Sequence, residues 1–306
     1  MDSALIITQA INGLQLGVLL FLLSAGLTLT FGIMDLINLA HASFFMLGAF
    51  VGATLTLATG SFLAGVVGAL FAIAIIAYAV ERSVIQHLYA RDHLDQLLAT
   101  FGLILIADSA VHLIWGPAGI AIPLPDILNG QVQFGSQQLP TFRLVIIAAG
   151  LVVAMGLYWL VNKTRTGMLI RAGASNRAMV GALGINIRQL FSGVFAVGAV
   201  LAGLAGMLIA PITEASIGMG NDIIITAFVV VIIGGIGSIK GAFVAAIMIG
   251  MIDTFGRAYL DSIFNLFMAT ETAETAAPAV SAMLIYLSMA AILILKPQGL
   301  FPPRLR

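Results

Sequence analysis

The sequence predicts an all-α membrane protein, a single-domain bundle of about eight or nine transmembrane segments over residues 1–306. Two observations support this fold class. Hydrophobic residues make up 61% of the chain and charged residues only 8%, with a mean hydropathy of +1.12. Soluble domains carry about 25% charged residues. In addition, residues 4–34 and 36–80 contain no Asp, Glu, Lys or Arg, and about 20 apolar residues cross a bilayer.

Nine hydrophobic segments follow in order along the chain. The first run supplies one span, and "ATGSF" at 58–62 divides the second run into two. We expect the pair around 222–260 to include broken helices because glycine gathers there. The remaining candidates are about 96–115, 142–162, 188–211, 222–239, 241–260 and 279–296.

The orientation follows from the distribution of Lys and Arg, which favour cytoplasmic loops. The stretch 163–188 holds five basic residues and no acidic one, and 81–96 and the C-terminal tail are also rich in Arg or Lys. In contrast, 116–140 and 261–278 contain acidic residues and no basic one. With nine crossings, the sequence therefore predicts an outer N-terminus and a cytoplasmic C-terminus.

Several function classes are not supported. The absence of cysteine excludes thiolate metal sites and Cys nucleophiles, and no acidic metal cluster or catalytic Ser–His–Asp arrangement is visible. The net charge is zero, so nucleic acid is not an expected partner. We expect no catalytic residue, no metal and no cofactor in this chain.

A polar interruption separates the first two hydrophobic segments. Asp35, Asn38 and His41 lie within seven residues, between two long apolar runs. One interpretation is a short interfacial turn in which Asn38 caps a helix. The other is a discontinuous segment that lines a water-filled route, where unwound backbone can find partners.

A glycine-rich stretch follows at 229–250. Glycine at this density disfavours a continuous helix, so Gly234, Gly235, Gly237 and Ser238 predict a sharp turn near the cytoplasmic face. The spacing does not match the G-x-x-x-x-G-K-[ST] phosphate loop, and we therefore expect no ATP hydrolysis here.

The basic segment 164–190 is long enough for a short helix around 173–183. Gly184 is a plausible left-handed residue at its end. Apolar residues on one side and Asn and Arg on the other favour a docking helix over a solvated loop. Elsewhere, Asp108 with His112, and Asp253 with Arg257, are spaced to pair along a helix.

Four stretches together carry a family resemblance. They are "GLTLTFGIMDLINLAHASFFMLGAFV", "LATFGLILIADSAVHLIWG", "TRTGMLIRAGASNRAMVGALGINI" and "VVVIIGGIGSIKGAFVAAIMIGMI". In this order the chain resembles the LivH-type permease of branched-chain amino acid ABC transporters (HAAT family), over nearly its whole length. The resemblance implies a permease with inverted halves, in an importer of the bacterial inner membrane. It also implies a second, LivM-type permease, two ATPase subunits (LivG and LivF types) that hydrolyse ATP, and a periplasmic binding protein.

The resemblance also suggests roles for particular residues. The 164–190 segment is similar to a coupling segment that docks on an ATPase, with Arg171, Asn176, Arg177 and Gly184 as candidates. Asn38 and His41 match the family's N-x-A-H turn and would shape the translocation pathway or gate, together with the glycine-rich turn. The solute stays open among branched-chain amino acids, urea, amides and other acids. A secondary transporter or a channel is the alternative, with Asp108 as its coupling site.

Overall fold

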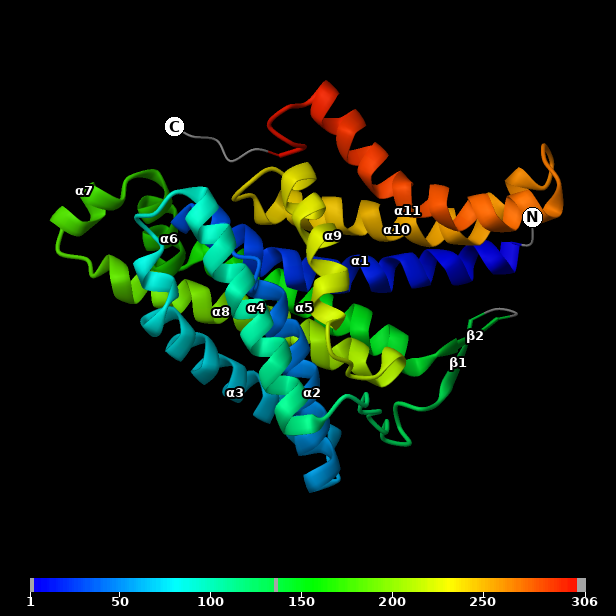
Figure 1. Ribbon diagram of the computed structural model, residues 1–306, viewed down its shortest axis with the longest axis horizontal. Helices are drawn as coiled ribbons and strands as arrows, with labels where there is room; N and C mark the ends of the chain where they lie inside the picture. Colours follow the sequence, from blue (N-terminus) through cyan, green and yellow to red (C-terminus); the bar gives the residue numbers. More distant parts are fainter. Residues whose placement is uncertain (1–2, 135–136, 302–306) are drawn as a thin grey trace.

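The computed structural model describes residues 3–134 and 137–301; in addition, the side chains of residues 3–4, 134, 137 and 177–178 lie outside the description. Within these residues the chain is a helix bundle with one small hairpin (Figure 1). The elements are α1 (Ser3–Met34), α2 (His41–Thr59), α3 (Phe62–Ser83), a 3-10 turn (Ile85–His87), α4 (His93–Trp115), β1 (Gln131–Phe134), β2 (Gln137–Pro140), α5 (Thr141–Lys163), α6 (Arg165–Ser175), α7 (Arg177–Ala182), α8 (Ile187–Thr213), α9 (Met219–Gly234), α10 (Ile239–Phe264) and α11 (Thr270–Leu295).

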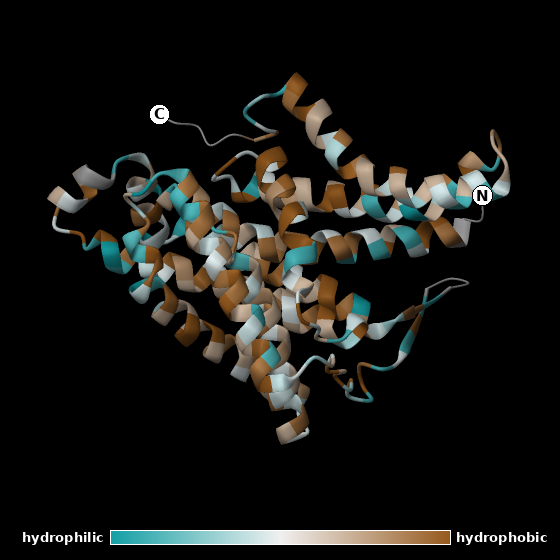
Figure 2. Ribbon diagram, in the orientation of Figure 1, coloured by the Kyte–Doolittle hydropathy of each residue, from teal (hydrophilic) through white to brown (hydrophobic). Residues whose placement is uncertain are grey.

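The predicted fold class is confirmed. In the described part of the chain, eight helices are long and apolar enough to cross a membrane. The ninth apolar helix, α9, has only 16 residues and is therefore roughly 24 Å long, short of the ~30 Å hydrocarbon core. Most of the helical ribbon is coloured brown to white, as expected for helices that face lipid and one another (Figure 2).

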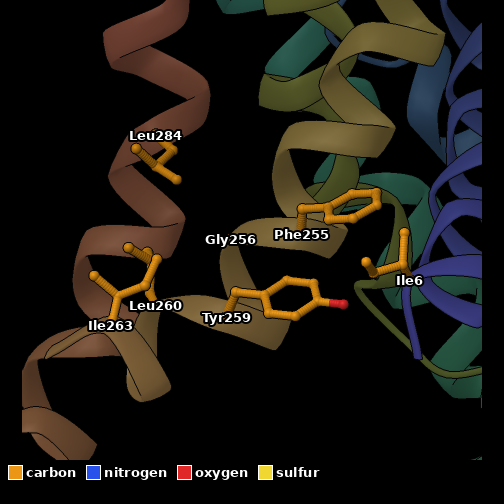
Figure 3. Close-up of a pocket in the computed structure, with 7 residues that line it drawn as sticks. All are labelled: Ile6, Phe255, Gly256, Tyr259, Leu260, Ile263 and Leu284. Carbon is orange, nitrogen blue, oxygen red and sulfur yellow. The ribbon is translucent and has the colours of Figure 1, made fainter. Parts of the chain in front are cut away.

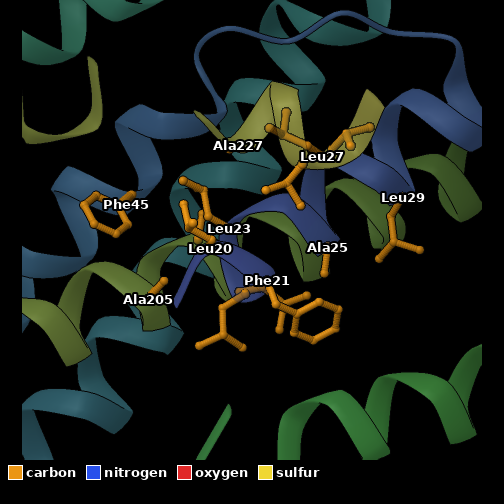
Figure 4. Close-up of a cluster of buried hydrophobic side chains, with 14 of the residues drawn as sticks. Leu20, Phe21, Leu23, Ala25, Leu27, Leu29, Phe45, Ala205 and Ala227 are labelled. Atoms are coloured by element: carbon orange, nitrogen blue, oxygen red, sulfur yellow. The ribbon is translucent and has the colours of Figure 1, made fainter. Parts of the chain in front are cut away.

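Helix α1 is the centre of the bundle. Every residue from Gly17 to Thr30 is buried, and a helix that is apolar on all sides belongs inside a bundle. It packs against α10 on one side and α8 on another (Figure 1). Its side chains reach in several directions, towards Phe45 of α2, Ala205 of α8 and Ala227 of α9 (Figure 4).

Two predicted boundaries were wrong, and one small element was not predicted. Helix α9 ends at Gly234 rather than near 239, because Gly235 has a φ of 98° and leaves the helical conformation. Helix α11 begins at Thr270 rather than 279, because its Ala-rich first turns are good helix formers. The outer connection after α4 also contains the antiparallel hairpin β1–β2, which the all-α prediction did not include.

Glycines allow the helices of the core to approach closely. A Cβ added at Gly206 of α8 would lie 1.8 Å from the carbonyl oxygen of Phe45 on α2, and one at Gly48 would lie 2.3 Å from that of Gly203. Small residues at such contacts are how membrane helices associate, since lipid supplies no hydrophobic drive between them.

We therefore expect Gly206→Val to lower the thermal stability of the purified protein in detergent, by at least the roughly 1–3 kcal/mol typical of overpacking. Gly156→Val in α5 is the matched control, because a Cβ there meets nothing within 4 Å. Thermal denaturation followed by size-exclusion chromatography measures both. Equal losses in the two variants would contradict close α2–α8 packing.

Candidate translocation and coupling site

The break between α1 and α2 lies inside the bundle. Asp35 adopts a left-handed φ of 53°, and the chain then turns back so that α2 begins at His41. The Nε2 atom of His41 lies 3.2 Å from the carbonyl oxygen of Leu23 on α1. Leu23 is about three turns, or roughly 16 Å, before the end of α1 at Met34. The non-helical residues 35–40 therefore run back alongside α1 rather than lying beyond its end.

Side chains of α4 satisfy the backbone of this break. The Ile37 amide donates to Oε1 of Gln96 at 3.0 Å, and the Leu39 amide donates to Oγ1 of Thr100 at 3.2 Å. Gln96 and Thr100 are both buried. Unwound backbone at membrane depth persists only where it is satisfied by protein or water, so α4 holds the break in place.

The Asn38 side chain is fully buried, and within the described residues neither its Nδ2 nor its Oδ1 has a hydrogen-bond partner. The Nδ1 atom of His41 is also without a partner there. The N-cap position of α2 is Ala40, with no side-chain cap, so the interpretation of Asn38 as a capping residue was wrong. The absence of a side chain at Gly26 leaves room for the His41 imidazole, because a Cβ at Gly26 would lie 2.7 Å from Nε2 of His41.

The predicted turn between α9 and α10 is present. Gly235 and Gly237 have φ values of 98° and 84°, a region that favours glycine. Ser238 caps α10, since its side chain accepts from the Gly241 amide at 3.1 Å. Gly234 and Gly241 bring the two helices into backbone contact, since a Cβ on Gly241 would lie 1.9 Å from the Gly234 carbonyl oxygen.

The C-terminal segment closes over this turn. The Leu300 amide donates to the carbonyl of Ile233 at 2.8 Å, and the Phe301 amide donates to that of Gly234 at 3.1 Å. A Cβ on Gly235 would lie 3.1 Å from the Gln298 carbonyl oxygen. Gly235 thus faces the C-terminal segment, while Gly237 contacts Gly32 of α1.

The predicted single helix over 173–183 was wrong. The basic segment forms two helices, α6 and α7, which break at Asn176. Asn176 has an extended backbone, and its side chain accepts from the Met179 amide at 2.9 Å. Asparagine favours this capping position over a helix interior, which explains the break.

Gly184 and Arg171 fix the end of α7 and the attachment of α6. Gly184 has a left-handed φ of 83° just after α7, as predicted for a helix end. Arg171 donates from Nη1 to the Val161 carbonyl near the end of α5, which ties α6 to the bundle. The side chain of Arg177 lies outside the described residues.

One cavity brings part of the predicted site together. It measures about 950 Å³ and is lined by the ends of α1 and α5, by α6, by the α9–α10 turn and by Phe301. Arg171, Gly237 and Ser238 line it. Among the predicted site residues whose side chains the structure describes, Asn38, His41, Gly234, Gly235, Asn176 and Gly184 are not among its lining residues.

A second cavity, of about 360 Å³, lies near the start of α1, against the C-terminal half of α10 and the middle of α11 (Figure 3). Its lining is apolar apart from the Tyr259 hydroxyl, which points towards α1. None of the predicted site residues lines it.

Of the two side-chain pairs predicted within the transmembrane helices, one forms, and in the other the carboxylate has a different partner. Asp253 and Arg257 form the predicted ion pair, with 2.9 Å between Oδ1 and Nε. Asp108 instead accepts from Asn221 of α9 at 3.0 Å. The interhelical partner gives this carboxylate a structural role in joining α4 to α9.

Sequence reasoning missed the partners of both non-helical stretches. Gln96 and Thr100 are polar and lie four residues apart, so they share one face of a mostly apolar helix. This spacing was the signal in the sequence that could have identified them as partners of the α1–α2 break. The return of residues 300–301 to the α9–α10 turn has no comparable signal in the sequence.

These features define a polytopic membrane protein of the transport class, with two non-helical stretches inside a helix bundle and a short basic helical segment at one end. The family model described as "Branched-chain amino acid transport system / permease component" matches residues 9–293. The chain belongs to this family. No solved structure gives a significant match.

Curated relatives agree with this assignment. The chain is 29% identical over 276 residues to the high-affinity branched-chain amino acid transport system permease protein LivH of Escherichia coli (strain K12), covering 84% of this chain and 88% of that one. It is 29% identical over 263 residues to BraD of Pseudomonas aeruginosa, with 81% and 85% covered. A probable LivH of Methanocaldococcus jannaschii is 30% identical over 263 residues, with 81% and 80% covered.

The contact between the break and α4 makes a specific prediction. Thr100→Val keeps the side-chain shape and removes the hydroxyl that accepts from Leu39. A buried amide left without a partner costs about 1–3 kcal/mol, so the thermal denaturation midpoint in detergent should fall. Thr100→Ser retains the hydroxyl and should stay close to wild type. A Ser variant less stable than the Val variant would contradict the role of this hydrogen bond.

Proposed function

We propose that this chain is the permease subunit of an ATP-driven importer that carries branched-chain amino acids or related small solutes across the bacterial inner membrane. The observation that carries the proposal is the family match over residues 9–293, which spans nearly the whole helix bundle. The chain supplies the passage and no cofactor. A LivM-type permease, two ATPase subunits of the LivG and LivF types and a periplasmic binding protein complete the transporter, and the partner ATPases hydrolyse ATP.

In this proposal the two non-helical stretches form the gate. Residues 35–40 and 235–238 leave the helical conformation, so small backbone rotations there can move α2 or α10 without breaking helical hydrogen bonds. The unpartnered polar atoms of Asn38 and His41 support this role, because buried groups without partners favour a second conformation that hydrates them.

The coupling segment is α6–α7, as part of 164–190. Arg171 fixes it to the end of α5, and Asn176 and Gly184 set its shape through their backbone conformations. Arg177 would meet an acidic or backbone partner on the ATPase. Arg171, Gly237 and Ser238 line one cavity. In this proposal a movement of α6 is therefore transmitted over a short distance to the α9–α10 turn.

The orientation proposed here has the N-terminus in the periplasm and the C-terminus in the cytoplasm. The α6–α7 end of the bundle lies opposite the N-terminus along the long axis (Figure 1). It carries the predicted cytoplasmic Lys and Arg residues, in agreement with the preference of these residues for the cytoplasmic side.

Reconstitution in proteoliposomes tests the function. Leucine uptake should require the chain together with both ATPases, the second permease, the binding protein and ATP. Uptake by the lone chain along an ion gradient would contradict the proposal and favour a secondary transporter. Uptake of urea or a short amide in place of leucine would retain the importer and overturn the amino-acid assignment.

Gly184→Val tests the coupling segment. A Cβ at Gly184 meets no atom within 4 Å, so the variant acts through the left-handed backbone alone, at roughly 1–2 kcal/mol. ATP hydrolysis stimulated by the binding protein should fall several-fold. Gly181→Ala is the matched control, because its Cβ would make an ordinary contact of 3.9 Å with Ile187. Wild-type stimulation in Gly184→Val would mean that 164–190 is a solvated loop.

A further inference from the structure

The 950 Å³ cavity at the cytoplasmic end of the bundle has features of a ligand site. Its charged lining residues are Arg171 and Lys240, and none of its lining residues is an Asp or a Glu. The only salt bridge among the described residues joins Arg257 and Asp253, so no carboxylate of the described residues lies within 4 Å of either cation. Two cations without a counter-charge attract an anion.

The arrangement of these cations leaves them able to bind a ligand. Within the described residues, Arg171 makes one hydrogen bond, to the Val161 carbonyl, and a guanidinium has five N–H donors. Lys240 is exposed, and its Nζ lies 5.1 Å from the centre of the Phe301 ring. It stands in the first turn of α10, where the helix dipole adds positive potential.

The cavity lies near the ends of three helices. The last turns of α1 and α5 and the first turn of α10 line it, so its opening is at the level where three helices reach the cytoplasmic boundary. Tyr158 in its wall and the adjacent Trp159 are 53% and 62% exposed, and exposed aromatic residues of this kind mark the membrane interface.

The remaining walls suit an acyl chain. Leu29, Ile33, Val161, Ile170 and Ile239 contribute aliphatic surface to the same cavity. A zwitterionic amino acid would leave its ammonium without an acidic partner here. An amphiphile with an anionic head satisfies both the cations and the apolar walls.

We propose that this cavity binds the phosphate headgroup of an anionic phospholipid from the cytoplasmic leaflet, through Lys240 and Arg171. The proposal depends on the orientation given above and not on the solute. Basic pockets between transmembrane helices on the cytoplasmic side are suited to such headgroups. The lipid would lie between α6 and the α9–α10 turn.

Native mass spectrometry of the purified full chain tests the proposal. Wild type should retain phosphatidylglycerol in preference to phosphatidylcholine with the same acyl chains. Lys240→Gln should weaken this retention roughly fivefold, as expected for one cation near an anionic headgroup, and Lys240→Arg should restore it. Arg82→Gln is the matched control, because Arg82 carries the same charge in the predicted cytoplasmic segment 81–96 and does not line the cavity.

Four results would overturn the proposal. Equal retention of the two lipids, or unchanged retention in Lys240→Gln, would remove the headgroup site. Displacement of phosphatidylglycerol by inorganic phosphate to the same extent in every variant would identify a free-anion site instead. Loss of the lipid when the complete transporter is assembled would mean that a partner subunit fills the cavity.

Discussion

Backbone amides and carbonyls inside a membrane must form hydrogen bonds within the protein. The rest of this structure depends on how the α1–α2 break and the α9–α10 turn meet this requirement. Residues 35–40 leave the helical conformation inside the bundle, and α4 satisfies them through Gln96 and Thr100. The end of α9 is satisfied by the amides of Leu300 and Phe301. In both cases the partner comes from a distant part of the chain. The breaks are therefore tertiary features, each maintained by an element distant in sequence.

The surroundings of the two breaks are closely packed. Helix α1 is buried on all sides between Gly17 and Thr30, and it contacts both sites, through Leu23 and Gly26 at the first and through Gly32 at the second. Glycine contacts leave little room for sliding, because an added Cβ would overlap neighbouring backbone. Close-packed interiors transmit displacement instead of absorbing it. The C-terminal segment contacts the end of α9 directly, through the amides of Leu300 and Phe301.

Local chemistry made much of this fold predictable from the sequence. Long apolar runs predicted the spans, the Asp35–His41 interruption predicted the first break, and the glycines at 234–237 predicted the second. The partners of these breaks were not predicted: Gln96 and Thr100 gave only the signal of two polar residues on one helix face, and residues 300–301 act through tertiary contacts without any local signal. The hinge at Asn176 was missed because a helix interior and a helix cap were both compatible with the local pattern, and the hydrogen bond to Met179 decides between them. The predicted roles of the site residues in gating and coupling stay predictions.

Hydrogen–deuterium exchange of the assembled transporter, with and without ATP, tests the central claim most directly. If residues 35–41 and 234–238 are the moving parts of a closely packed bundle, ATP should change exchange in those two stretches and in α6–α7. The core of α1 between Gly17 and Thr30 should remain protected in both states. Changes spread evenly over the transmembrane helices, or confined to the outer hairpin β1–β2, would contradict the account.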